Sequence, residues 1–159
     1  MKTPERKIAL TIVKDLAVSK SWSFRYNELL GDQFIFEICR EPGKWNSIPH
    51  SKMSHIINQL ATGHHGLNAS RSLITGGSYL CVCGEPETRE HFLHHCEIYT
   101  RQRSKWLHNV NLTLLSYYAS TSEISPSVIF GQCPDLSRGT NINNLKHLTE
   151  FLNSTRRFK

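Results

Sequence analysis

Apolar residues along most of the chain recur at every third or fourth position, which is the spacing of one face of an α-helix. The clearest stretch carries four such residues: Met53, Ile56, Ile57 and Leu60. Ser51 precedes this stretch as a candidate N-cap, and Gly63 follows it as a candidate terminator. The pattern therefore predicts a short helix that ends before Gly63.

Two further helices are predicted in the first half of the chain. In the first segment, Thr3 and Pro4 favour a helix start, and three apolar residues share one face: Ile8, Ile12 and Leu16. A second short helix is predicted to begin with Asn68 as its N-cap and to carry Leu73 and Ile74.

The second half of the chain predicts longer helices. One begins after Pro86 and continues towards Val110, because five residues follow a 3.6-residue period: Phe92, Cys96, Tyr99, Trp106 and Val110. Another apolar stripe lies near the end: Ile142, Leu145, Leu148 and Leu152. Residues 34–38 could form a strand, but a single strand has no sheet to join. The predicted fold class is mostly α.

Composition bounds the size and the class of the protein. The 159 residues are 38% hydrophobic with a mean hydropathy of −0.39, which supports one small domain with a modest core. No run approaches the roughly 18 apolar residues of a membrane span, and the apolar stretch at residues 8–13 is too short for a signal peptide. We therefore expect an intracellular protein, nuclear or cytoplasmic, with reduced thiols and no membrane association.

The five cysteines are an odd number, which argues against a complete disulfide framework. Three of them lie within sixteen residues together with a histidine, in the order Cys-x-Cys-x₇-His-x₄-Cys: Cys81, Cys83, His91 and Cys96. Zinc binds four tetrahedral nitrogen or sulfur ligands, commonly two from a tight turn and two from a following helix. Gly84 suits such a turn. The other two cysteines, Cys39 and Cys133, are predicted to be small core residues.

The spacing of the last two candidate ligands leaves two alternatives. His91 and Cys96 are five positions apart, so an ideal α-helix would turn them about 140° from each other. Either the helix frays at Cys96, or His95, four residues from His91 and on the same face, replaces Cys96 as the ligand. In both cases four protein ligands leave no open position for water, so the predicted zinc is structural.

This segment resembles the zinc-knuckle-like tail that follows the RNase H domain in polyproteins of non-LTR (LINE-type, jockey-like) retrotransposons. The matching positions are Leu60 to His64, Leu67 and Asn68, Cys81, Cys83 and Gly84, Glu87 and Thr88, His91 to Leu93, Cys96, Tyr99 and Arg103. Residues 42–45 and the ending at residues 151–158 also look like parts of that tail, so the likeness covers about residues 43–159. The family usually has a longer gap between the first two cysteines.

The resemblance implies a domain at residues 43–159, a small helical domain with a zinc-knuckle-like turn-and-helix site. Residues 1–42 would form an N-terminal helical segment or linker, a remnant after RNase H. It also implies a non-catalytic accessory module that binds RNA or DNA without sequence specificity and works with a retroelement reverse transcriptase or RNase H. The paired aspartates of a polymerase are absent, and Asp15, Asp32 and Asp135 show no RNase H pattern.

The net charge of +6 and the isoelectric point of about 9.2 favour a polyanionic partner. Six basic residues near the cluster and the chain end are candidate nucleic-acid contacts: Arg89, Arg101, Arg103, Lys105, Arg156 and Arg157. Three thiolates would over-neutralise Zn²⁺ by one charge, so nearby cations matter more for attracting phosphate. Tyr99 and Trp106 could stack on bases, although their helical spacing favours the core. The alternative function is a zinc-stapled protein-interaction domain that does not bind nucleic acid.

Overall fold

The computed structural model describes residues 37–38, 45–47, 52–63, 65–114 and 124–158. Within these ranges the regular elements are all helical, and the only β-type pairing is an isolated antiparallel bridge between Leu80 and Pro86. The prediction of a mostly α fold is confirmed. No helix in the described part of the chain is both long enough and apolar enough to cross a membrane. The helix predicted around residues 3–16 lies outside the described residues.

In the described ranges, the named elements follow one another in this order: α3 (Lys52–Thr62), α4 (Asn68–Thr75), the π-turn η1 (His91–His95), the 3-10 turn η2 (Glu97–Tyr99), α5 (Thr100–Leu114), α6 (Pro126–Ile129) and α7 (Arg138–Thr155). Helix α3 ends before Gly63, as predicted, and buries Ile57 and Leu60. Residues Glu37 and Ile38 are helical, so the strand considered for residues 34–38 does not form over its described part.

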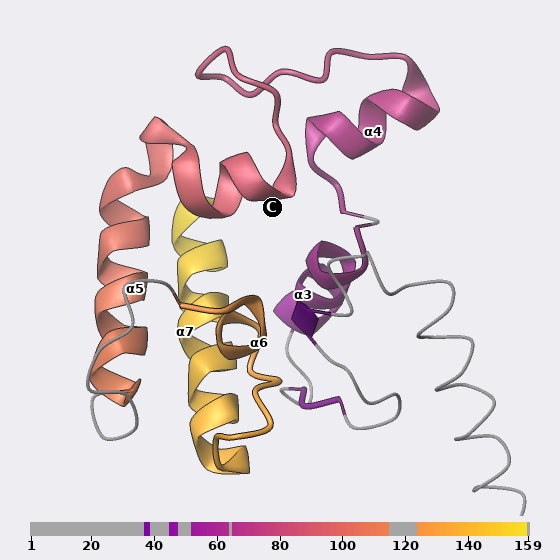
Figure 1. Cartoon of the computed structure of the whole chain (residues 1–159). Coiled ribbons are helices and arrows are strands. Elements are labelled where there is room, and N and C mark those ends of the chain that lie inside the picture. Colours follow the sequence, from indigo (N-terminus) through magenta and orange to yellow (C-terminus); the bar gives the residue numbers. More distant parts are fainter. Residues whose placement is uncertain (1–36, 39–44, 48–51, 64, 115–123, 159) are drawn as a thin grey trace, which may run out of the picture.

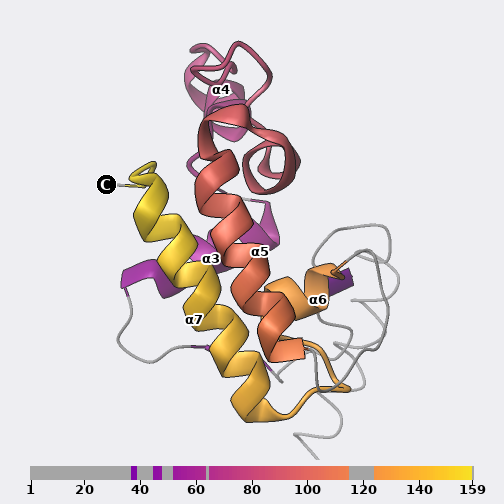
Figure 2. The same ribbon diagram turned by 90° about the vertical axis from the view of Figure 1, so that its left-hand side faces the viewer.

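The body of the protein, which we define as α3, α5, α6 and α7, is built around α7. Helices α5 and α7 lie side by side in opposite directions, and α3 and α6 also pack against α7 (Figures 1 and 2). Three residues of the predicted stripe on α7, Leu145, Leu148 and Leu152, are fully buried. The apolar periodicity of α7 therefore correctly predicted which face of the helix packs in the core.

An aromatic cluster fills the space between α5, α7 and the π-turn. Trp106 stacks on Phe151 with ring centroids 4.7 Å apart. Phe92 contacts the rings of three residues at centroid distances of 5.2, 5.7 and 5.5 Å: Tyr99, Phe151 and Phe158. Phe92 directly follows His91 in the chain, so this cluster connects the candidate ligands to the core.

The turn after α6 approaches the backbone of α7 closely. Gly131 has a φ of +61°, and a Cβ atom there would lie 2.4 Å from the carbonyl oxygen of Asn141. The side chain of Asn141 accepts a hydrogen bond from the N–H of Cys133 and donates one to its carbonyl. Both contacts are in the interior, so this turn has little freedom to move away from α7.

The arm, which we define as residues 68–86, comprises α4 and the loop that follows it. In both views it extends away from the body (Figures 1 and 2). Helix α4 buries no residue, and Leu73 and Ile74 are each 88% exposed. Burial of apolar surface therefore contributes little to the position of the arm.

The N-terminus of α4 differs from the prediction, because Asn68 is its first helical residue and not its cap. The side chain of Asn68 instead donates to the carbonyl of Leu80 across the arm, at 2.7 Å. The backbone N–H of Asn68 donates to the carboxylate of Glu87, also at 2.7 Å. The carboxylate of Glu87 thus accepts a hydrogen bond from a free N–H at the start of α4, where the side chain of Asn68 was expected to act as the cap.

The single long helix predicted from Pro86 towards Val110 is also corrected. The chain becomes helical at Arg89, forms the π-turn, leaves helical geometry at Cys96, and resumes through η2 into α5. The predicted face is nonetheless buried at all five positions, Phe92, Cys96, Tyr99, Trp106 and Val110. The reason for the break lies in the ligand geometry described next.

Candidate metal centre

The first two candidate ligands lie in a tight turn at residues 81–84, the ligand turn. The N–H of Cys81 donates to the carbonyl of Glu85 at 2.7 Å, and the N–H of Gly84 donates to the carbonyl of Cys81 at 2.9 Å. Gly84 has a φ of +96°, a conformation that side chains with a Cβ rarely adopt. Glycine at this position therefore lets the chain reverse directly after Cys83.

The other two candidate ligands come from the short helical segment that follows. The hydroxyl of Thr88 accepts from the N–H of His91 at 3.0 Å, which caps the start of this segment. The N–H of Cys96 then donates to the carbonyl of His91 at 2.7 Å, a bond that spans five residues as in a π-helix. Because this turn is wider than an α-helical turn, residues five apart return to the same side.

This π-turn resolves the conflict in spacing between the last two ligands. Of the two alternatives left open, the end of the helix at Cys96 is the one observed, with Cys96 at a ψ of 120° outside the helix. The helix does not simply fray, because its last turn widens into the π-turn. His95 does not join the cluster. Its side chain is 66% exposed, and its Nε2 lies 3.5 Å from the carboxylate of Glu90.

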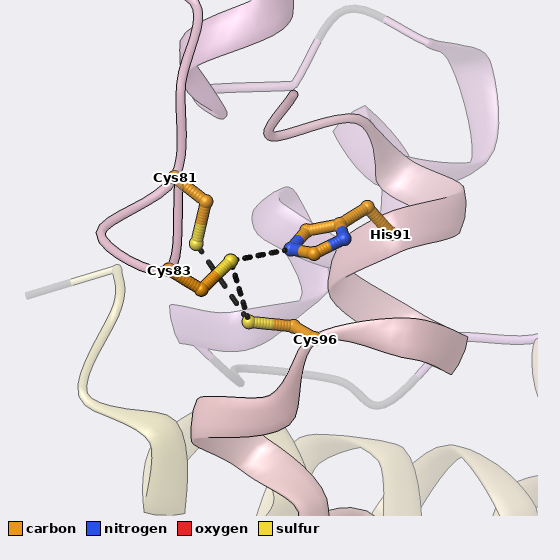
Figure 3. Close-up of side chains that lie close together, drawn as sticks. All are labelled: Cys81, Cys83, His91 and Cys96. Atoms are coloured by element: carbon orange, nitrogen blue, oxygen red, sulfur yellow. Dashed lines mark hydrogen bonds between the residues drawn. The ribbon is translucent and has the colours of Figure 1, made fainter. Parts of the chain in front are cut away.

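The four ligand atoms of Cys81, Cys83, His91 and Cys96 lie within 4.8 Å of one another (Figure 3). The sulfur of Cys96 is 3.7 Å from that of Cys81 and 3.9 Å from that of Cys83. A tetrahedral zinc ion with bonds of about 2.3 Å to sulfur separates its sulfurs by roughly 3.8 Å. Both distances fit sulfurs that share one ion and are too long for a disulfide, and all three cysteines are free.

The fourth ligand fits the same arrangement. The Nε2 atom of His91 lies 3.2 Å from the sulfur of Cys83, a few tenths of an ångström shorter than the nitrogen–sulfur edge around zinc. Cys81 and Cys96 are buried, whereas Cys83 and His91 are partly exposed. The cluster can therefore hold a metal ion at the edge of the core, with thiolate and imidazole donors that suit zinc.

The thiols differ in how readily they ionise. A backbone hydrogen bond from Glu85 holds the pKa of the Cys83 thiol below its ordinary value. Burial raises the pKa of the Cys96 thiol to about 11. A bound cation favours the thiolate form of every cysteine it contacts, so metal binding to this cluster would release protons.

Glu87 and Arg157 join the arm to the end of α7. The Nε and Nη2 atoms of Arg157 donate to the two carboxylate oxygens of Glu87, each at 2.6 Å, and the Glu87 side chain is only 3% exposed. Although burial opposes ionisation of Glu87, the hydrogen bonds from Arg157 and from the N–H of Asn68 place its pKa below the ordinary value. This bidentate pair fixes the chain at Glu87, just before the helical segment that carries His91 and Cys96.

Arg103 and Arg89 also help to hold residues 89–96, the ligand segment that carries His91 and Cys96. Arg103 is 8% exposed and donates to the carbonyls of Leu93 and Cys96, at 2.8 and 2.7 Å. Arg89 donates to the carbonyl of Leu60 at the end of α3, at 3.1 Å. Three of the six basic residues predicted to contact nucleic acid, Arg89, Arg103 and Arg157, are thus engaged with other parts of the chain.

The other three predicted contacts, Arg101, Lys105 and Arg156, are exposed. Arg101 and Lys105 lie one turn apart on α5 and line an open groove of about 420 Å³ between α5 and α7. The opposite wall includes His147 and Glu150. Arg156 follows the groove at the C-cap of α7.

The aromatic residues considered for base stacking face the interior. Tyr99 and Trp106 are 9% and 2% exposed, and both belong to the aromatic cluster. The helical spacing of these two residues therefore correctly indicated a place in the core. Cys133 is buried as predicted, and Cys39 lies outside the described residues.

Two residues that support the site, Arg103 and Glu87, are not predicted from the sequence to do so. Arg103 continues the apolar stripe of Phe92, Cys96, Tyr99 and Trp106 at a spacing of four and three residues, so periodicity could have placed it inside. Glu87 was noted only as a matching residue. Its partner Arg157 is seventy residues away, and no local pattern connects them.

No protein-family model, curated protein or solved structure matches the chain. The resemblance to retroelement tails remains a prediction that rests on the residues quoted for it. The possible metal-binding group rests on the geometry of Cys81, Cys83, His91 and Cys96.

Proposed function

We propose that the chain is a non-catalytic module whose fold is stapled by one structural zinc ion. The observation that carries the proposal is that three thiol sulfurs and one imidazole nitrogen lie within 4.8 Å of one another at the junction of the arm and the body. Four protein ligands complete the coordination of zinc and leave no position for a reactive water. The soft sulfur donors favour zinc over magnesium or calcium.

Metal analysis of purified protein tests the zinc centre. Wild type is expected to hold one equivalent of zinc, and Cys83→Ser is expected to hold much less. Cys133→Ser is the matched control, because Cys133 is also buried but lies outside the cluster. Wild type without zinc, or an equal zinc content in the wild type and Cys83→Ser, would show that the ligand set is wrong.

We further propose that the module binds nucleic acid through its exposed cations. Arg101 and Lys105 project from one face of α5 beside the groove, and Arg156 extends the basic surface at the end of α7. The net charge of +6 supports association with a polyanion. Such contacts reach phosphates and carry no sequence information.

A salt titration tests this part of the proposal. Binding to single-stranded RNA or DNA should weaken steeply with salt, and the double variant Arg101→Gln/Lys105→Gln should reduce the log–log slope by about 1.4. Lys146→Gln is the control, because Lys146 is exposed on α7 but does not line the groove. Absence of binding at low salt would eliminate a nucleic-acid function and leave the zinc centre unaffected.

A second candidate function is docking to a protein, and the exposed apolar residues of the arm favour it. Leu73, Ile74 and Val82 are 88%, 88% and 95% exposed. The retroelement reverse transcriptase or RNase H implied by the sequence resemblance is the partner to test. Docking through the arm should be insensitive to salt and should be lost in Leu73→Ser/Ile74→Ser, whereas nucleic-acid binding should be unchanged in that variant.

A further inference from the structure

Arg103 is a buried cation. Among the described residues, its guanidinium donates to neutral carbonyls, those of Phe92, Leu93 and Cys96. No carboxylate in the described part of the chain pairs with it. Arg157 provides the contrast, because its charge is matched by Glu87. A charged group removed from water without a counter-charge is costly, so the position of Arg103 calls for a negative charge nearby.

The loaded metal centre would supply that charge. One Zn²⁺ ion, three thiolates and a neutral imidazole sum to a charge of −1. Cys81 and Cys96, which bring two of the thiolates, are themselves buried. The centre would therefore carry a partly buried negative charge that also needs compensation.

The contacts of Arg103 place its charge beside the ligands. Its Nη2 atom donates to the carbonyl of Cys96 at 2.7 Å, and its Nε atom donates to Leu93, which lies inside the π-turn between His91 and Cys96. A fixed positive charge this close to the ligand segment would stabilise thiolates there once a metal is bound.

We propose that Arg103 is the internal counter-charge of the metal centre and sets its affinity for zinc. The inference rests on the proposed zinc centre and adds a positioning residue to it. Arg103 does not coordinate the metal. Its hydrogen bonds to the carbonyls of the ligand segment keep the guanidinium beside the centre, where its charge offsets the excess negative charge that three thiolates leave on the ion.

The charge of the centre can be changed separately from Arg103. In Cys83→His, two thiolates and two imidazoles would leave the loaded centre neutral, while four ligands remain. A residue that only caps carbonyls would matter equally in both centres. A residue that compensates charge would matter only where three thiolates are present.

Zinc affinity, measured on the full chain by competition with a chromophoric chelator, tests this difference. Arg103→Gln is expected to weaken zinc binding about 10- to 100-fold, and Arg103→Lys, which keeps the charge, is expected to weaken it less. In the Cys83→His background, Arg103→Gln should change the affinity by less than about threefold, as expected for a residue whose charge no longer has a partner. Lys146→Gln, which removes an exposed cation on α7 away from the cluster, should leave the affinity unchanged.

The possible outcomes separate the two proposals. If wild type does not bind zinc, the metal centre itself is wrong. If wild type binds zinc but Arg103→Gln binds it equally well, or loses the same factor in both backgrounds, only the role of Arg103 is wrong. In case Arg103→Gln does not fold, the NMR signal of the Arg103 Nε–H gives a readout with Arg103 intact. It should shift on zinc loading of wild type and shift less in Cys83→His, and equal shifts would overturn the proposal.

Discussion

The body and the arm are stabilised by different kinds of interaction. The body buries large apolar side chains, among them Trp106, Leu148 and Phe151. In the arm, α4 has no buried residue, and several apolar residues of the arm are exposed. The arm is positioned by hydrogen bonds, by the Glu87–Arg157 pair, and by the candidate ligands Cys81 and Cys83.

This difference shows why a metal would be useful at this place. In the described residues the helices of the body pack around α7, and only 38% of the whole chain is hydrophobic. A structural zinc ion adds stability that does not depend on apolar area, because its binding free energy becomes folding free energy. The ion would sit where the apolar packing ends and the polar connections begin.

Removal of the metal is expected to have the largest effect, and it should affect the arm more than the body. Structural zinc contributes on the order of 10 kcal/mol in small modules. Chelation should therefore abolish amide hydrogen-exchange protection around Cys81, Cys83 and Cys96, while Val110 in α5 and Leu148 in α7 retain part of theirs. Equal loss in both regions would show that the body has no independent stability. No loss would show that the arm does not need the metal.

A core substitution should have the opposite regional effect. Phe151→Ala removes the ring that stacks on Trp106 and contacts Phe92, and should cost about 3–5 kcal/mol of unfolding free energy in urea. Leu112→Ala, at a position 54% exposed on α5, should cost less than about 0.5 kcal/mol. Zinc content at low temperature should stay at one equivalent in both variants. Loss of zinc from a folded Phe151→Ala would contradict the separation of the two regions.

The Glu87–Arg157 pair should contribute less than the core, because Arg157 is 22% exposed. Glu87→Gln is expected to cost about 2–3 kcal/mol, whereas Glu90→Gln, at an exposed position, should cost less than about 0.5 kcal/mol. Urea unfolding of the zinc-loaded proteins at pH 7 measures both values. A cost for Glu87→Gln no larger than that for Glu90→Gln would show that the pair does not hold the arm.

The same pair predicts a pH dependence. The folded-state pKa of Glu87 lies below the ordinary value of 4.5, so its ionised form is stabilised by folding. The extra stability is complete above the unfolded-state pKa and is lost as the pH falls below it towards the folded-state pKa. The difference in unfolding free energy between wild type and Glu87→Gln should therefore be constant from pH 7 to about 5.5 and shrink below about 4.5. A difference that stays constant at lower pH would contradict this assignment.

Two glycines of the arm provide the smallest and most local test. Gly84 in the ligand turn and Gly76 at the end of α4 have φ values of +96° and +67°, and neither has an atom within 4 Å of a Cβ position. Alanine at either site should cost about 1–2 kcal/mol through backbone strain. Only Gly84→Ala should also weaken zinc binding. Equal zinc affinities of the two variants would show that the ligand turn tolerates the change.

The body was largely predictable from the sequence, because its packing follows a regular spacing. The stripe ending at Leu152 on α7 and the face from Phe92 to Val110 are both buried as their periodicity indicated. The break at Cys96 had a signal in the five-residue spacing from His91, but the π-turn that relieves it was not predictable. It includes the hydrogen bond from the N–H of Cys96 to the carbonyl of His91, which no residue type in the sequence announces.

The supporting residues of the site were predicted less well than the candidate ligands. Residue type and spacing were enough to select Cys81, Cys83, His91 and Cys96, which the structure brings together. Arg103 and Arg157 were assigned to nucleic acid because charge alone does not indicate burial. The partners of Arg103 are three backbone carbonyls in and next to the π-turn, and the partner of Arg157 is a carboxylate seventy residues away. Both sets of contacts depend on the tertiary fold.

The central claim is that one zinc ion joins the arm to the body through four protein ligands. X-ray absorption at the zinc edge of purified wild-type protein tests this claim most directly. The account predicts three sulfur ligands at about 2.3 Å and one nitrogen ligand at about 2.0–2.1 Å, with no oxygen in the first coordination shell. Protein that contains no zinc, or zinc bound by fewer than three sulfurs, would contradict it.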